Sequence, residues 1–269
     1  MGVRGSIKTF LDKIYLIRML YLIGIGLNSK QISLEAIEAI KSSDSVFLEG
    51  YTSEYSQGTI NEIEELVGKK VILLGRKGVE EKFDSVLLSA KSNNIALLII
   101  GNALTATTHI QLLIDSKEND VKYKVIPGIS ITNTIAETGL DEYKFGRTVT
   151  ICYHQENFEP ETFFDQILEN QKIGLHTLCL LDIKKDENPK RLMNCKEAIE
   201  ILEKISNKRN QKNNFEYLGL FAMSSLKQKI IFGKEKIISF KEIYDLFPQS
   251  LIILGKTNAK EKEFLEKMY

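Results

Sequence analysis

The sequence predicts an α/β protein with a parallel sheet in its first part and a mixed sheet in its second part. Three observations predict this class. From Met19 onward, short apolar runs alternate with segments of helical periodicity. The run 20–25 (LYLIGI) is nearly continuously apolar and the run 95–100 (IALLII) is apolar throughout, as expected of strands buried on both faces. In the second part, some strands are separated by helices and others only by short turns, which favours mixed pairing there.

The first domain is predicted to cover residues 19–128. Its strands are expected at 20–25, 45–48, 71–74, 95–100 and 123–126. Its helices are expected at about 33–41, from Thr59 with Glu62 as capping-box partner, over 79–91, and around 110–114. Pro127-Gly128 closes this half.

The second domain is predicted to cover residues 129–269. Strands are expected at 148–153, 177–183, 217–222, 230–232 and 250–254. Helices are expected at 130–137, stopped by Gly139, after Pro160 near N1, after Asn194 with Glu197 in a capping box, and from Ser239 with Glu242. The polar stretch 206–214 predicts a surface loop, and a polar helix ends the chain.

Composition excludes several classes of protein. The 269 residues contain 36 Lys and Arg against 36 Asp and Glu, which argues against a basic surface for nucleic acid, so no direct nucleic-acid binding is expected. Three cysteines without a Cys-x-x-Cys pair favour a reducing compartment. Three histidines without ligand spacing favour no metal site. No apolar run is long enough to span a membrane.

Residues 1–18 form a basic extension before a second methionine, Met19. Its apolar residues recur at roughly helical spacing, and Gly2 and Ser6 match a loose myristoylation pattern. A weak organellar presequence, a lipidated terminus and a plain upstream extension all remain open, and the plain extension is favoured.

Two loops after buried strands are candidate ligand sites. Gly24-Ile25-Gly26 lacks the third glycine of a dinucleotide fingerprint, so a ligand and a simple tight turn are equally expected there. The loop 101–109 carries Asn102, Thr105 and two further threonines, more than a helix cap needs, which favours binding of a polar small molecule. No Gly-x-Ser-x-Gly turn is present and no cysteine has an evident activating partner, so no catalytic nucleophile is named.

Five blocks of sequence together resemble the diphthine synthase family. They are 20–27 (LYLIGIGL), 49–53 (EGYTS), 106–109 (ATTH), 143–146 (YKFG) and 176–184 (HTLCLLDIK), and the last of them resembles the eukaryotic branch. The resemblance runs from Met19 to about Leu254.

The resemblance implies a two-domain tetrapyrrole-methylase fold with a cofactor cleft between the domains. It implies a cytoplasmic, homodimeric methyltransferase that uses S-adenosyl-L-methionine and releases S-adenosyl-L-homocysteine. The implied substrate is the aminocarboxypropyl-histidine of translation elongation factor 2, with diphthine methyl ester as product. Transferred by position, the cofactor contacts would be Leu27, Asn102, Thr105, Ser130, Ile131, Leu181, Ser224 and Gln249. No general base and no metal are expected, because the sulfonium already activates the methyl group.

Three positions depart from the family pattern. Asn102-Ala103 replaces Asp-Pro, Met223 replaces an arginine, and Gln249 replaces a histidine. The neutral amide of Asn102 would lose roughly 1 kcal/mol relative to a charge-assisted hydrogen bond. Two alternatives therefore stay open: a methyltransferase of the same fold acting on a tetrapyrrole or RNA, and a degenerate member that binds without catalysis.

Overall fold

The computed structural model describes residues 18–80, 82–156, 158–211 and 214–269, and the predicted extension lies outside these except for Arg18. The chain divides into two compact units. Unit 1 contains the described residues up to Thr52 and Gly58–Ser130, and unit 2 contains Ser53–Gln57 and Ile131–Tyr269. The chain therefore leaves unit 1 at Ser53 and returns to it at Gly58. No helix in the described ranges is long and apolar enough to cross a membrane.

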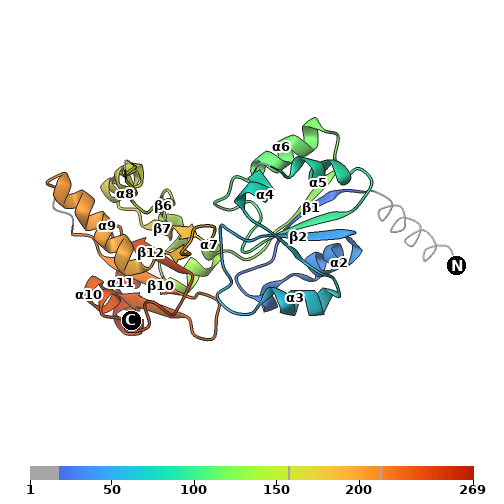
Figure 1. The fold of residues 1–269 in the computed structure, drawn as a ribbon. Helices are drawn as coiled ribbons and strands as arrows, with labels where there is room; N and C mark the ends of the chain where they lie inside the picture. Colours follow the sequence, from blue (N-terminus) through green and yellow to red (C-terminus); the bar gives the residue numbers. More distant parts are fainter. Residues whose placement is uncertain (1–17, 81, 157, 212–213) are drawn as a thin grey trace. The chain divides into compact units, whose positions relative to one another are not determined.

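Unit 1 is built on a parallel five-stranded sheet in the order β3-β2-β4-β1-β5. The strands are β1 (Leu20–Gly24), β2 (Ser45–Glu49), β3 (Ile72–Leu74), β4 (Ile95–Ile99) and β5 (Tyr123–Ile126). The helical elements are η1 (Ser29–Gln31), α2 (Leu34–Ser42), α3 (Ile60–Val67), α4 (Arg76–Glu80), α5 (Asp84–Ser89) and α6 (Ile110–Glu118). Figure 1 shows α2 and α3 on one side of the sheet and α4, α5 and α6 on the other. Every residue of β4 is buried, as its uninterrupted apolar run predicts.

Unit 2 is built on a mixed five-stranded sheet in the order β11-β10-β12-β7-β6. The strands are β6 (Val149–Ile151), β7 (Thr177–Leu181), β10 (Tyr217–Phe221), β11 (Lys229–Phe232) and β12 (Gln249–Ile253), with a separate hairpin of β8 (Ile183–Lys184) and β9 (Arg191–Leu192). The helical elements are α7 (Ile131–Thr134), η2 (Ile135–Thr138), η3 (Glu142–Lys144), α8 (Thr162–Lys172), α9 (Cys195–Lys208), α10 (Lys234–Ile238) and α11 (Ala259–Met268). Only β6 and β7 pair in parallel, and the other neighbours in the sheet are antiparallel. The predicted parallel and mixed sheets are both confirmed.

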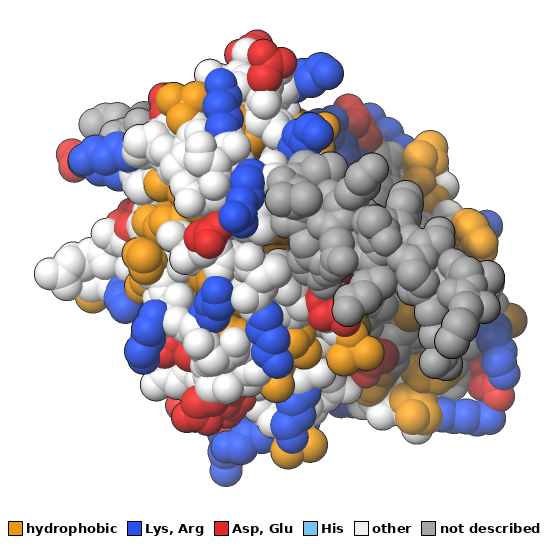
Figure 2. Space-filling view, turned by 90° about the vertical axis from the view of Figure 1, so that its right-hand side faces the viewer, with side chains coloured by type: hydrophobic (Ala, Val, Ile, Leu, Met, Phe, Trp, Pro, Cys, Tyr) orange, Lys and Arg blue, Asp and Glu red, His pale blue; other side chains and the backbone are white. Residues whose placement is uncertain are grey.

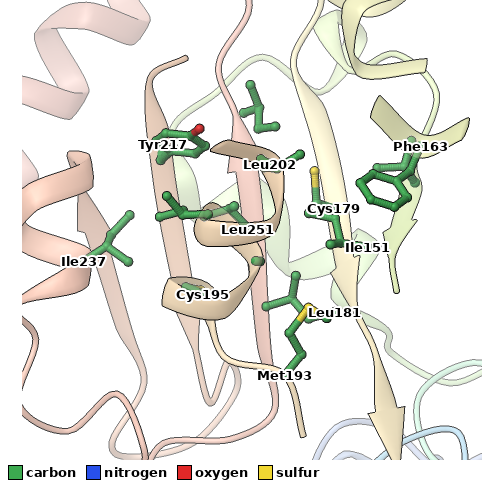
Figure 3. Packing of buried hydrophobic residues seen from close by; sticks show 14 of the residues in the cluster. Ile151, Phe163, Cys179, Leu181, Met193, Cys195, Leu202, Tyr217, Ile237 and Leu251 are labelled. Atoms are coloured by element: carbon green, nitrogen blue, oxygen red, sulfur yellow. The ribbon is translucent and has the colours of Figure 1, made fainter. Parts of the chain in front are cut away.

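Alternating side chains of β7 enter different cores of unit 2. Cys179 and Leu181 join a cluster with α8, α9 and α10, whereas Leu178 joins a cluster with α11. Figure 3 shows the first of these cores, with Leu181 and Met193 near one end of the strand. Both faces of the sheet are thus covered, which explains why β7 is apolar after Thr177.

The C-terminal helix α11 is fixed by a buried polar network. The carboxylate of Glu261 is 2% exposed and accepts hydrogen bonds from His176 Nε2 (3.1 Å), Lys144 Nζ and the N–H of Asp141 (3.0 Å). The N–H of Gly255 donates to His176 Nδ1 (2.9 Å), so the ring proton must lie on Nε2. Burial opposes ionisation of Glu261, but its hydrogen bonds from Lys144, the backbone and His176 outweigh burial and lower its pKa to about 2.

Several element boundaries differ from the sequence prediction. The helix predicted over 79–91 is two helices, α4 and α5, since the chain turns to bury Phe83 between them. The helix predicted to begin at Ser239 is wrong: α10 ends there, and the Ser239 hydroxyl donates back to the carbonyl of Glu235 (2.7 Å). Pro160 precedes the N-cap Glu161 and is not at N1.

Caps and loops explain the other differences. Asn194 and Glu197 form the predicted capping box of α9, which continues to Lys208 and so replaces the first part of the loop predicted at 206–214. At α3 the box is half formed: Thr59 accepts from the N–H of Glu62, but the Glu62 carboxylate accepts from the Ser29 hydroxyl.

Candidate functional site

Three glycines bring the carboxyl ends of β1, β4 and β5 into backbone contact. A Cβ added to Gly24 would lie 2.6 Å from the nitrogen of Gly128 and 2.7 Å from the oxygen of Gly101. A Cβ added to Gly128 would lie 2.2 Å from the same oxygen. Ligands of parallel α/β sheets bind outside the carboxyl ends of the strands, which is where this glycine cradle (Gly24, Gly101 and Gly128) lies.

Positive backbone angles let the loops after β1 and β4 pair with each other. Gly26 (φ 78°) and Gly101 (φ 87°) exchange two backbone hydrogen bonds, of 3.2 and 2.8 Å. The N–H of Leu27, the next residue, donates to Oε1 of Gln31 at 2.9 Å. The chain thus continues beside the end of β4 as far as Gly26, with a bend only at Leu27, and its backbone there is fixed by neighbouring groups.

The cradle has room on one side. A Cβ added to Gly101 would meet no heavy atom nearer than the Cβ of Ser130, at 3.8 Å. Ser130 itself is buried. A small molecule can thus approach the Gly101 backbone beside Ser130, a position that any other residue's side chain would fill.

Asn102 holds the loop after β4 against the end of β5. Its amide nitrogen donates to the carbonyl of Gly128 at 3.2 Å, and its amide oxygen accepts from the N–H of Leu104 at 3.1 Å. The N–H of Thr105 also faces the carbonyl of Asn102, at 3.4 Å. The carboxylate that the resemblance predicts at this position could not donate to the Gly128 carbonyl, so the amide of Asn102 makes a contact that aspartate would lose.

A buried acidic group lies at the end of β2. Glu49 is 1% exposed, and its Oε1 accepts from the N–H groups of Tyr51 and Thr52, both at 2.8 Å. The Thr52 hydroxyl also donates to this carboxylate. Tyr51 donates its phenol to Glu80 (3.3 Å), and the Arg76 guanidinium lies 4.8 Å from its ring centroid. Burial and the charges of Glu49 and Glu80 raise the pKa of Tyr51 well above its ordinary value.

His109 contacts the loop after β4 and is within range of the charge of Glu49. The side chain is 2% exposed, and its Nδ1 lies 3.3 Å from the carbonyl oxygen of Ala103. Its Nε2 is buried and has no hydrogen-bond partner among the described residues. Burial lowers the pKa of His109, and the charge of Glu49 opposes this only in part. Sequence reasoning assigned no role to Glu49 or His109, although both lie in blocks that carry the family resemblance.

The predicted contacts in unit 2 offer mainly backbone groups. Leu181 is buried in a core cluster, and Ile131 packs against the other cluster. Ser224 has a left-handed backbone (φ 67°), and its N–H donates to Gln228 Oε1 at 2.8 Å. Gln249 is buried and fully engaged: its oxygen accepts from the N–H of Cys195 (2.8 Å), and its nitrogen donates to two backbone carbonyls.

Met223, where the resemblance predicts an arginine, is 3% exposed and packs in the apolar cluster that contains Leu265. Within the described residues no group of three or more His, Cys, Asp and Glu side chains is placed to hold a metal ion. Burial raises the pKa of the Cys179 and Cys195 thiols, so neither is a poised thiolate.

The comparison with known proteins defines the class. A family model, Tetrapyrrole (Corrin/Porphyrin) Methylases, matches residues 19–236. Together with the two α/β sheets and the glycine cradle, this match makes the chain an S-adenosylmethionine-dependent methyltransferase of that fold.

The similar proteins narrow the class further. The chain is 36% identical to diphthine methyl ester synthase of Saccharomyces cerevisiae, covering 92% of this chain and 88% of that protein. It is 34% identical to diphthine synthase of Methanocaldococcus jannaschii, covering 92% and 98%. A crystal structure of diphthine synthase superposes with a TM-score of 0.80 at 28% identity, covering 92% and 94%. The chain belongs to the diphthine synthase family.

Proposed function

We propose that this chain transfers methyl groups to the aminocarboxypropyl-histidine of translation elongation factor 2, giving diphthine methyl ester. The names of the similar proteins support the substrate class, since relatives that cover nearly the whole chain are diphthine or diphthine methyl ester synthases. The observation that carries the cofactor assignment is the open side of the glycine cradle, at Gly101 beside Ser130.

The residues present fit the cofactor. When bound, S-adenosylmethionine supplies a methyl group on a positively charged sulfur, from which a nucleophile displaces it. Leu27, Asn102, Thr105 and Ser130 in unit 1 would hold it. The bare backbone at Gly101 lets a flat or polar group approach without steric conflict, and the Asn102 hydrogen bonds keep that backbone rigid.

The chain's own contribution to the reaction is alignment. An amine must be uncharged when it attacks, and a water-poor surround lowers an amine's pKa by disfavouring the ammonium form. The end of β1, Gly24 to Leu27, consists of buried or backbone-bonded groups, which suits a site of this kind. No side chain of the described residues is assigned the role of a general base.

A tetrapyrrole or RNA substrate is less well supported. The family model carries the tetrapyrrole name, but the similar whole-length proteins carry the diphthine synthase name. Figure 2 shows Lys and Arg side chains interspersed with acidic and apolar ones on the face it presents. This mixture differs from the continuous basic stripe that RNA binding favours. We further propose that the chain acts as a homodimer in the cytoplasm, where elongation factor 2 operates.

The test is methyl transfer to elongation factor 2 that carries aminocarboxypropyl-histidine, with the product weighed by mass spectrometry. We expect three methyl groups on the amine and one on the carboxylate. Product without the ester indicates a diphthine synthase that stops at the amine. Cofactor binding without any added methyl mass refutes catalysis and supports a degenerate binding member. Light scattering of the purified chain tests the homodimer.

Two alanine variants test the cradle within the same assay. Gly101→Ala places a methyl group beside Ser130 at a positive φ. Gly68→Ala, at the end of α3, has a similar positive φ (68°) and no heavy atom within 4 Å, so it carries the same backbone strain without entering the cradle. We expect cofactor affinity to fall about tenfold for Gly101→Ala only, because the added methyl group enters the space proposed for the cofactor; a tenfold fall corresponds to the loss of about one good polar contact. Equal affinities of both variants contradict the assignment.

A further inference from the structure

We propose that His109 is a positioning residue for the cofactor loop: its Nδ1–H holds the carbonyl of Ala103 and so fixes the turn from Asn102 to Thr105. This rests on the proposed function, because the turn matters only if S-adenosylmethionine binds there. His109 is not among the cofactor contacts that the family resemblance predicts. The proposal is argued from the hydrogen bonds and burial of its ring.

The hydrogen-bond partner of Nδ1 determines the tautomer. A carbonyl oxygen only accepts, so the Nδ1 atom, 3.3 Å from the oxygen of Ala103, must carry a proton. In the uncharged ring Nε2 then bears only a lone pair. That atom is buried and has no partner among the described residues, so the uncharged ring loses no donor in this position.

The surroundings favour the uncharged ring. Glu49 at the end of β2 and Glu80 in α4 are the charged groups that act on His109, and both also act on Tyr51. Glu49 accepts from the N–H groups of Tyr51 and Thr52 and from the Thr52 hydroxyl, and neither carboxylate makes a hydrogen bond to Nε2, which has no partner among the described residues. A proton added to Nε2 would therefore be buried without an acceptor.

A charged ring gains stability by moving toward the Glu49 carboxylate or toward water. Either movement breaks the hydrogen bond to Ala103. Ala103 is fully buried and directly follows Asn102, whose side chain is hydrogen-bonded to Gly128 and Leu104. Loss of the hydrogen bond to the Ala103 carbonyl therefore loosens the loop that Asn102 holds in place. Cofactor affinity is thus expected to weaken as the pH falls below the ordinary histidine range.

Two isosteric amides separate the two ring nitrogens. In His109→Asn the amide nitrogen occupies the place of Nδ1 and can donate to Ala103, but it does not titrate. In His109→Gln the amide nitrogen lies near the place of Nε2, and the donor to Ala103 is lost. Both are neutral and polar, so they differ mainly in which of the two positions they preserve.

The experiment is calorimetric titration of S-adenosyl-L-homocysteine into wild type, His109→Asn and His109→Gln between about pH 5.5 and 8. We expect the dissociation constant of His109→Asn to match wild type within about threefold near pH 7.5, and that of His109→Gln to be about tenfold weaker. The dissociation constant of wild type divided by that of His109→Asn should rise about fivefold as the pH falls toward 5.5. Ionisation of the ligand affects both proteins equally, so it does not change this ratio. Equal weakening of both variants, or an unchanged ratio across pH, overturns the proposal.

Nitrogen NMR of the wild-type protein tests the tautomer without any variant. The chain has three histidines, so assignment is direct. We expect His109 to be protonated on Nδ1 and His176 on Nε2, and the resonances of His109 alone to shift when the ligand is added. A proton on Nε2 of His109 refutes the proposal. Absence of ligand binding to wild type refutes instead the cofactor assignment on which it rests.

Discussion

Replacing Asn102 by Asp introduces the carboxylate that the resemblance predicts at this position, where the Gly128 carbonyl needs a hydrogen-bond donor. The side-chain nitrogen of Asn102 donates to the Gly128 carbonyl at 3.2 Å, and aspartate would put a charged oxygen there. The hydrogen bond from the N–H of Leu104 to the other oxygen remains possible. The change is thus confined to one contact, which makes its magnitude accessible.

Two effects add at this contact. Loss of the neutral hydrogen bond costs about 1 kcal/mol of stability. The Gly128 carbonyl, left facing a carboxylate, costs about 1 kcal/mol more, which is the low end of the cost of an unsatisfied buried group because Asn102 is only half-buried. We expect Asn102→Asp to lower the free energy of unfolding at pH 7.5 by ~2 kcal/mol, or the midpoint of thermal unfolding by about 5 °C.

The pH dependence of this deficit has a definite sign. Repulsion by the Gly128 carbonyl raises the folded-state pKa of the new carboxyl above its unfolded value of about 4. A group with a raised folded-state pKa favours the folded state at low pH, because its protonated form can donate to the carbonyl. The deficit relative to wild type should therefore shrink as the pH falls from about 6 to 4.

The assay is thermal unfolding followed by circular dichroism at several pH values, with Asn93→Asp as the control. The Asn93 amide also donates to a backbone carbonyl, that of Ser89 at 3.1 Å, but lies outside the cradle. Both variants should lose stability, and only Asn102→Asp should change affinity for S-adenosyl-L-homocysteine. A midpoint equal to wild type at pH 7.5, or a deficit that grows on acidification, refutes the reasoning.

Three further outcomes follow from contacts elsewhere in the chain. Gly24→Ala should lower the free energy of unfolding by ~3 kcal/mol or more, measured by urea denaturation, since its Cβ would meet backbone at 2.6 Å, whereas Gly75→Ala, with no heavy atom within 4 Å, should not destabilise. Glu261, whose pKa is lowered to about 2, stabilises the fold above about pH 4.5 and progressively less as the pH falls toward 2. Glu261→Gln should be less stable at neutral pH and should lose this dependence of stability on acid pH. If the loss of stability between pH 4.5 and 2 is the same in both proteins, the role of the buried network is contradicted. Cys152, which is half-buried, should react with a thiol reagent in the native state before the two fully buried cysteines do, and simultaneous reaction of all three would contradict the core packing.

The sequence predicted the sheets better than the helices. Strands such as β4 are apolar throughout and bounded by turn residues, so their periodicity is unambiguous. Short helices in unit 2 depend on tertiary contacts: Ser239 follows the pattern of an N-cap but ends α10 because its hydroxyl donates to the preceding turn. The assignment of the Ser53–Gln57 segment to unit 2, with unit 1 on both sides of it in the sequence, has no local signal at all.

The candidate site was predictable where backbone chemistry dominates. Glycines after buried strands indicated close approach, and the structure shows their backbones in contact. The buried group of Glu49 and His109 could not be found in the same way, because its members are 60 residues apart and come together only when β2 and β4 pair. The sequence offered one indication of this group: Glu49 ends one buried strand, and His109 lies in the loop after another.

The departures at Asn102, Met223 and Gln249 have a common physical explanation. Each side chain is engaged inside its own unit: Asn102 by a backbone carbonyl and an N–H, Met223 by an apolar cluster, and Gln249 by the N–H of Cys195 and two carbonyls. Methyl transfer from a sulfonium needs alignment rather than proton transfer, so backbone groups held in place by such contacts suffice. These substitutions therefore affect chiefly how firmly the loops are held, and loss of the family's charged side chains is compatible with a working methyltransferase.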